Sequence, residues 1–143
     1  MRYLGIDFGT KKIGLAITDP SATLVLPYET LAFSSRKDLA GKITRIVHEE
    51  GIGSLIVGLP LDLNGRETLT TRQARNFAAD LVKRTGLPVY LVNEALTTFD
   101  ARESLIDAGI NPTVSKKVLD RMAAVRILES YLESPDKADP ANP

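Results

Sequence analysis

The chain of 143 residues is 43% hydrophobic and carries 18 basic and 18 acidic side chains. A chain of this size and composition is predicted to form one domain around a single core, and its zero formal net charge means that any nucleic-acid surface must be a local patch. The absence of cysteine excludes disulfides, thiolate metal sites and a cysteine nucleophile, and the single histidine, His48, excludes a histidine-rich metal site.

No apolar run approaches the ~20 residues of a membrane span, and the N-terminus lacks a basic region followed by an apolar core. We therefore expect a soluble, cytoplasmic protein with no membrane partner. His48 is expected in the last turn of a helix, on the surface, where its imidazole can face the helix C-terminus.

Two apolar runs, Tyr3–Phe8 and Ile13–Thr18, flank the short link of residues 9–12 and predict two strands joined by a tight turn. This pairing places Asp7 inside a strand. A carboxylate in an apolar strand is costly to bury unless a lysine, a hydrogen-bond donor or a metal ion pairs with it. Asp7 is therefore a candidate site residue, with a purely structural or turn aspartate as the alternative.

The next segment, Leu24–Leu31, is predicted to be an edge strand because Pro27 cannot donate a hydrogen bond to a central ladder. The remaining chain alternates helices and strands. In chain order we expect a helix from Ser34 or Ser35 to about Gly51, a short strand at 54–57 buried on both faces, a mobile polar loop at 61–68, a helix at 70–85, a strand at 89–92, a helix from Thr97 or Thr98 to Ala108, a helix at 115–132, and a disordered tail at 134–143.

The order of these elements predicts where acidic side chains meet. Helical crossovers join parallel strands of one sheet, so the strands that begin at Tyr3, Ser54 and Val89 should end at one edge. Asp7 and Glu94 both lie near such carboxyl ends, where open α/β sheets bind ligands. The topology thus predicts that two acids from distant parts of the sequence converge.

Asp120 is the third candidate acid. It shares a face of the last predicted helix with small apolar residues, among them Ala123 and Ala124, which would let that helix approach the sheet closely. The alternative is that Asp120 pairs with Lys116 or Lys117 on the helix surface.

Three converging acids without a matching cluster of bases would have raised pKa values or would need a cation. Carboxylate oxygens without thiolate or imidazole suit Mg²⁺ or Mn²⁺ better than Zn²⁺. Two such ions about 4 Å apart would activate a water and stabilise the leaving oxygen in phosphodiester cleavage.

Four blocks of the sequence carry a resemblance to a known family. These are Ile6–Lys11 (IDFGTK), Val57–Pro60 (VGLP), Asn93–Thr98 (NEALTT) and Lys116–Ala124 (KKVLDRMAA). Together, in this order and spacing, they look like the signature blocks of the YqgF family, which is similar to the RuvC-type Holliday junction resolvases.

The resemblance implies an α/β, ribonuclease H-like domain over residues 1–133, with a central five-stranded mixed sheet flanked by helices, its hairpin strands antiparallel and its later strands parallel. It implies a divalent-metal-dependent nuclease in which Asp7, Glu94 and Asp120 are the catalytic and metal-binding acids. It favours processing of the 5′ end of precursor 16S ribosomal RNA, in contact with ribosomal particles; cleavage of Holliday junctions or branched DNA is the alternative. The oligomeric state is left open between monomer and homodimer.

One departure from the family concerns the residues around Glu94. The family usually reads Asp-Glu-Arg where this chain reads Asn93-Glu94-Ala95. Asn93 keeps an oxygen but loses the charge, and Ala95 removes a cation. A catalytically poor nucleic-acid-binding module is therefore an alternative to the enzyme.

Basic residues surround the candidate acids in the sequence, and each could neutralise a phosphate. About half of them are expected to be ordinary solvated charges. Few aromatic side chains are free to stack on bases, so recognition should rest on backbone and shape. The candidate substrate contacts are Lys11, Lys12, Arg66, Arg72, Arg75, Lys116, Lys117 and Arg121.

A rival reading rests on residues 7–10 (DFGT), which also look like the first phosphate loop of the actin and sugar-kinase superfamily. Those proteins bind ATP between two ribonuclease H-like domains. This chain is long enough for one such domain and has no second phosphate loop of the Asp-x-Gly-Gly kind, so an ATP-binding protein is the less favoured alternative.

Overall fold

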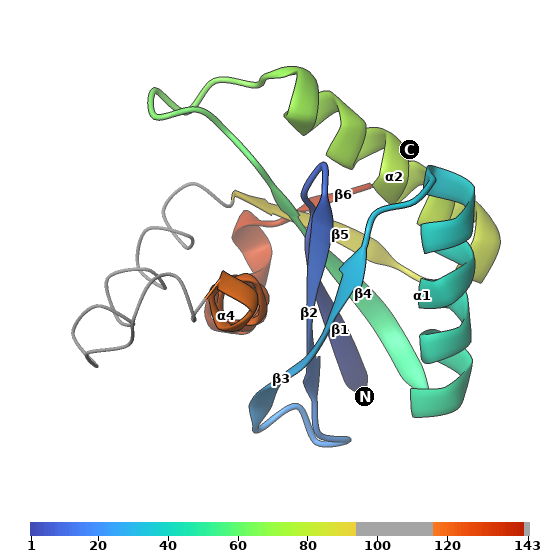
Figure 1. Cartoon of the computed structure of the whole chain (residues 1–143). Helices are drawn as coiled ribbons and strands as arrows, with labels where there is room; N and C mark the ends of the chain where they lie inside the picture. The colour runs from blue at the N-terminus through green and yellow to red at the C-terminus, as the bar shows by residue number, and fades with distance from the viewer. Residues whose placement is uncertain (94–115, 142–143) are drawn as a thin grey trace.

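The computed structural model describes residues 1–93 and 116–141, with the side chains of residues 1–93 and 121–141. This part of the chain forms a six-stranded sheet in the order β3-β2-β1-β4-β5-β6. Helices α1 and α2 cover one face of the sheet and α4 covers the other (Figure 1). The elements are β1 Arg2–Asp7, β2 Lys12–Thr18, β3 Val25–Ala32, α1 Arg36–Glu50, β4 Ile52–Leu59, α2 Leu69–Thr85, β5 Val89–Asn93, α4 Lys116–Glu133, a 3-10 turn η1 Pro135–Lys137, and β6 Asp139–Pro140.

The strand directions follow the prediction. The pairs β1/β2 and β2/β3 are antiparallel, whereas β1/β4 and β4/β5 are parallel. Strand β3 is the edge strand that Pro27 indicated, and the β2/β3 register shifts next to this proline. The irregularity fits a residue without a backbone N–H, which is tolerated at edges and bulges.

The C-terminal tail corrects two expectations. The sheet has six strands rather than five, because β6 pairs antiparallel with β5. The expected disorder is therefore wrong for residues 134–141, where Ala141 N–H also donates to the Val89 carbonyl at 2.8 Å. A two-residue strand has no periodicity that a sequence pattern could reveal. Its pairing covers backbone groups that β5 would otherwise expose at the sheet edge.

Local capping explains where the first two helices begin and end. Ser35 accepts a hydrogen bond from Asp38 N–H at the start of α1, and Thr68 forms a capping box with Thr71 at the start of α2. Each helix ends at a glycine in the left-handed conformation, Gly51 with φ 64° and Gly86 with φ 69°. The helix expected from Thr97 or Thr98 to Ala108 lies outside the described residues.

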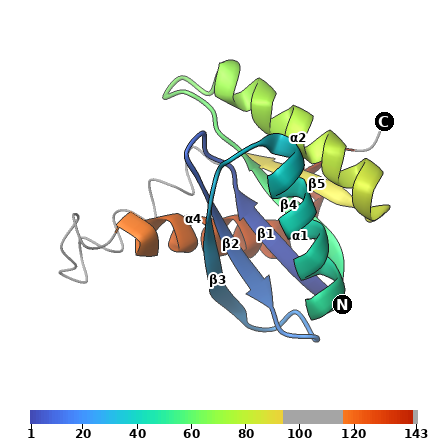
Figure 2. The same ribbon diagram turned by 45° about the vertical axis from the view of Figure 1, so that its right-hand side comes forward.

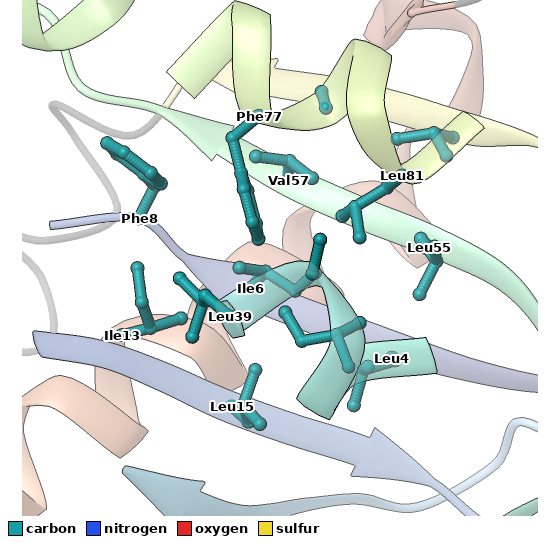
Figure 3. Packing of buried hydrophobic residues seen from close by; sticks show 14 of the residues in the cluster. Leu4, Ile6, Phe8, Ile13, Leu15, Leu39, Leu55, Val57, Phe77 and Leu81 are labelled. Carbon is teal, nitrogen blue, oxygen red and sulfur yellow. The ribbon is translucent and has the colours of Figure 1, made fainter. Parts of the chain in front are cut away.

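The sheet divides the expected single core into two clusters. On the α1/α2 side, alternate residues of β1 and β2 pack against both helices, and Phe8 lies 5.5 Å from Phe77 between ring centroids (Figure 3). On the α4 side, a second cluster contains Ile56, Leu128 and Tyr131. Strand β4 contributes to both clusters, which confirms its predicted burial on two faces, although it runs longer than expected.

Helix α4 lies very close to β1. A Cβ atom added to Gly5 would lie 2.5 Å from Leu128 Cγ and 3.0 Å from the Ala124 carbonyl oxygen. Ala123 and Ala124 are both buried, and Ala124 lies at this contact, as the prediction of a close approach required. The glycine and the small helix residues together set the distance between α4 and the sheet. Among the described helices, none is both long and apolar enough to cross a membrane.

Candidate active site at the carboxyl edge of the sheet

Asp7 is the last residue of β1 and is half-buried. Its register partners are Gly14 on β2 and Gly58 on β4. Because Leu4 and Ile6 pack on the α1/α2 side, the alternation of a strand directs Asp7 to the α4 side. Both cross-strand neighbours are glycines, so neither register partner places a side chain against the Asp7 carboxylate.

The predicted convergence of strand ends is present. Asp7 pairs with Gly58, Gly58 pairs with Val92, and Asn93 is the exposed final residue of β5. Strands β1, β4 and β5 therefore end at one edge. Glu94, which follows Asn93 in the sequence, lies outside the described residues.

Helix α4 advances along β1 towards Asp7. Near its C-terminal end, the Tyr131 ring lies 5.7 Å from the Tyr3 ring, and one to two turns earlier Leu128 and Ala124 meet Gly5. Position 120 precedes Ala124 by one turn, a further rise of ~5.4 Å, and alternate strand residues are ~6.6 Å apart. The helix axis thus carries position 120 in the direction of Asp7, while the side chain of residue 120 lies outside the described side chains.

Arg121 contacts a residue in the same cross-strand row as Asp7. Its Nε donates to Thr30 Oγ1 at 3.3 Å in a partly buried contact. Thr30 is the register partner of Gly14, which in turn pairs with Asp7. Two strand spacings of ~4.8 Å place Thr30 about 10 Å from Asp7. This arrangement puts an arginine on the α4 face at the level of the candidate acid.

The β1–β2 turn brings two lysines to this edge. Its backbone is tight, because a Cβ atom at Gly9 would lie 2.5 Å from the Lys12 carbonyl oxygen. Lys11 is exposed, and Lys12 is half-buried at the start of β2. Since Ile13 packs on the α1/α2 side, Lys12 belongs to the same face as Asp7.

The loop after β4 is more regular than expected. The Asp62 carboxylate accepts hydrogen bonds from the backbone N–H groups of Asn64 and Arg66, at 2.9 and 2.8 Å. Residues Leu61 and Glu67 form an antiparallel bridge that closes the loop as a small hairpin. The prediction of a loop is confirmed, and its turn is fixed by an aspartate side chain.

The three arginines in and after this loop that were predicted to contact the substrate, Arg66, Arg72 and Arg75, differ in their surroundings. Arg75 donates two hydrogen bonds to the Glu67 carboxylate. Arg75 Nε lies 2.6 Å from Glu67 Oε1, and Arg75 Nη2 lies 3.1 Å from Glu67 Oε2. These hydrogen bonds hold the pKa of Glu67 below its usual value. A phosphate would have to compete with Glu67 for Arg75, whereas Arg66 and Arg72 are exposed.

His48 lies in the last turn of α1 and is exposed, as expected. Helix α1 covers the face opposite to Asp7, so an imidazole ligand at the candidate site is excluded. Within residues 1–93 and 121–141 no group of three or more His, Cys, Asp or Glu residues is arranged to hold a metal ion. Of the three predicted acids, only the Asp7 side chain belongs to that part.

Sequence reasoning did not single out Gly14 or Thr30. Both matter only through the register, which sets Gly14 beside Asp7 and Thr30 next to Gly14. A glycine inside an apolar strand was the available signal, because it indicates a close approach of another group.

Solved structures identify the class of fold. The chain superposes on RuvC of Thermus thermophilus, in a complex described as RuvC with its Holliday junction substrate, with a TM-score of 0.58 at 16% identity over 98% of this chain and 99% of that one. It superposes on the fowlpox virus resolvase, in a complex with Holliday junction DNA, with a TM-score of 0.60 at 14% identity over 94% and 99% of the two chains. The protein therefore has the RuvC-like ribonuclease H fold that the sequence predicted.

Sequence comparison narrows this class to one family. Residues 1–134 match the family described as "RuvX: Holliday junction resolvase". A protein of Oleidesulfovibrio alaskensis named "Putative pre-16S rRNA nuclease" is 46% identical over 95% of this chain and 94% of its own length. A protein of Nitratidesulfovibrio vulgaris with the same name is 43% identical over 95% and 96%. The chain belongs to the RuvX family, also called YqgF, which confirms the resemblance of the four sequence blocks.

Proposed function

We propose that the protein is a divalent-metal-dependent nuclease that hydrolyses phosphodiester bonds at the 5′ end of precursor 16S ribosomal RNA. The observation that carries this proposal is the placement of Asp7 between Gly14 and Gly58 at the carboxyl edge of the sheet. A phosphodiester needs close access to the acid that holds the metal, and glycines allow a substrate backbone to approach closely. The names of the relatives support the choice of ribosomal RNA, and such a substrate would place the protein in the cytoplasm, in contact with ribosomal particles.

The donor set fits a hard cation. Asp7 offers carboxylate oxygens, the chain has no cysteine, and its single histidine lies across the sheet. We assign Asp7, Glu94 and Asp120 as the residues that hold Mg²⁺ or Mn²⁺. When bound, such ions supply an activated water and stabilise the leaving oxygen of the phosphodiester.

The basic residues of the site would hold and orient the substrate. Lys12 shares the face of Asp7, and Arg121 lies at the level of Asp7 on the α4 side. Each can neutralise a phosphate oxygen next to the cleaved bond. Lys11, Arg66 and Arg72 are exposed and would contact more distant phosphates.

The family description favours one alternative, resolution of Holliday junctions. A resolvase cuts two symmetric strands and would need a dimer. The two functions can be separated by comparing cleavage of a precursor 16S RNA fragment with cleavage of a synthetic four-way DNA junction, in Mg²⁺ and in Mn²⁺. We expect Asp7-dependent cleavage of the RNA near its mature 5′ end; symmetric cleavage of the junction with the RNA intact would support the resolvase instead.

A further inference from the structure

A hollow of about 470 Å³ with an excess of positive charge lies on the outer side of α1. Four of its lining side chains are cations and one is an acid, although the whole chain has equal numbers of both. Helix α1 provides most of the lining, and Arg84 comes from the last turn of α2. The lining residues are Ser35, Lys37, Asp38, Gly41, Lys42, Arg45 and Arg84; we call this surface the basic hollow.

The single acid of the basic hollow already has hydrogen-bond partners within the protein. Asp38 accepts hydrogen bonds from the Ser34 hydroxyl and from Lys42, whose Nζ lies 3.4 Å away, and these hold the pKa of Asp38 below its usual value. Asp38 therefore stays ionised and neutralises Lys42.

Within the described part of the chain, the other three cations of the basic hollow are not paired with an acid in this way. Among the described residues, no salt bridge engages Lys37, Arg45 or Arg84, and all three are exposed. Arg45 acts on Asp38 only through longer-range attraction. Three cations on two neighbouring helices are thus available to an external anion.

Consecutive residues at the start of α1 line the basic hollow and a second hollow that borders the β1–β2 turn. The second hollow, of about 220 Å³, lies between the β1–β2 turn and the start of α1 and is lined by Phe8, Thr10, Phe33, Arg36 and Gln73. Arg36, which forms a salt bridge with Asp80 at 2.8 Å, lines the second hollow, and its sequence neighbours Ser35 and Lys37 line the basic hollow. Helices α1 and α2 lie side by side on this face of the molecule (Figure 2).

Acidic side chains limit the basic surface on one side. Arg45 and Lys42 also line a neighbouring hollow, together with Glu29 and Glu49. These acids would repel a polyanion, so the favourable surface ends there. The surface that favours a polyanion therefore includes the basic hollow and ends at these acids.

We propose that the basic hollow binds the phosphodiester backbone of the nucleic acid that flanks the cleaved bond, through Lys37, Arg45 and Arg84. This inference rests on the proposed function, because it requires a nucleic-acid strand that is bound at Asp7 and extends beyond that site. Cations at exposed positions bind phosphates mainly by counterion release, which is insensitive to base sequence. The basic hollow would therefore extend the binding site without adding sequence specificity, for RNA and for DNA.

The test measures binding without cleavage. The double variant Arg45→Ala/Arg84→Ala is compared with the parent in an Asp7→Asn background, without divalent ions, by fluorescence anisotropy. For a single strand of ~20 nucleotides, loss of two phosphate contacts should reduce the slope of log K against log salt by about 1.5 and weaken binding about 20-fold at ~0.15 M salt. An oligomer of ~4 nucleotides, too short to reach from the edge to the basic hollow, should bind as before.

The control is the double variant Lys83→Ala/Lys137→Ala, which removes two exposed lysines outside the basic hollow. Thermal melting checks that all variants are folded. An unchanged salt slope in the Arg45/Arg84 variant, or an equal loss in the control, would overturn the assignment. The same measurements with an RNA strand and with a DNA strand show whether the protein recognises the phosphate backbone alone. If the Arg45/Arg84 variant loses binding of a poly-glutamate peptide but of neither nucleic acid, the proposal is also contradicted. Failure of the parent protein to cleave any substrate would count against the nuclease proposal and leave this binding result unaffected.

Discussion

Asp7 at the end of β1 and Gly58 at the end of β4 are direct partners in a parallel register. Any side chain at position 58 would stand next to the Asp7 carboxylate on the α4 face. The sequence motif VGLP thus has a structural meaning, because its glycine places no side chain beside the candidate acid.

Replacing Gly58 with alanine should lower the rate of cleavage about 10- to 100-fold, since small displacements of reacting groups are costly. The measurement is single-turnover cleavage of the RNA that the parent protein cuts. Because Gly58 is buried, urea unfolding must accompany it; a folded variant that cleaves at the parent rate would show that the site does not need a glycine at position 58.

Asp7→Asn should abolish cleavage and leave nucleic-acid binding within about threefold, because it removes a negative metal ligand without changing side-chain volume. Cleavage and anisotropy are measured on the same preparation. Asp136→Asn, at an exposed position in η1, is the matched control and should behave as the parent. Parent-level cleavage by Asp7→Asn would refute the assignment of Asp7.

Lys12→Ala should weaken binding and reduce the salt slope by about 0.7 to 0.9, the change expected for one lost phosphate contact. The comparison is with Lys83→Ala, an exposed lysine in the last turn of α2, for which the slope should not change. If the two variants have equal slopes, Lys12 does not contact a phosphate.

Gly5→Val should destabilise the protein by about 1–3 kcal/mol, because the added side chain would overlap with the packed helix α4. Its Cβ would lie 2.5 Å from Leu128 Cγ. Leu128→Ala should cost less stability in the Gly5→Val variant than in the parent, because it removes the overlap with Leu128 Cγ, although the Ala124 carbonyl oxygen would still be 3.0 Å from the new Cβ. Urea midpoints of the single and double variants give this coupling; full additivity of the two changes would contradict the close contact.

Local sequence patterns predicted most of the described secondary structure. Alternating apolar residues located β1 and β2, and the capping residues Ser35 and Gly51 marked the ends of α1. The tail escaped detection because β6 has two residues and exists only through its pairing with β5. A segment that short carries no pattern of its own.

The sequence by itself determined the family, the order of strands and helices, and Asp7 as a candidate acid, since periodicity and motifs are written in consecutive residues. Glu94 and Asp120 remain predictions of the same kind. Only the tertiary structure decided that Gly14 and Gly58 flank Asp7, and that α4 meets the sheet at Gly5. The physical reason is that register and helix distance depend on contacts between segments far apart in the chain, and no single segment contains that information.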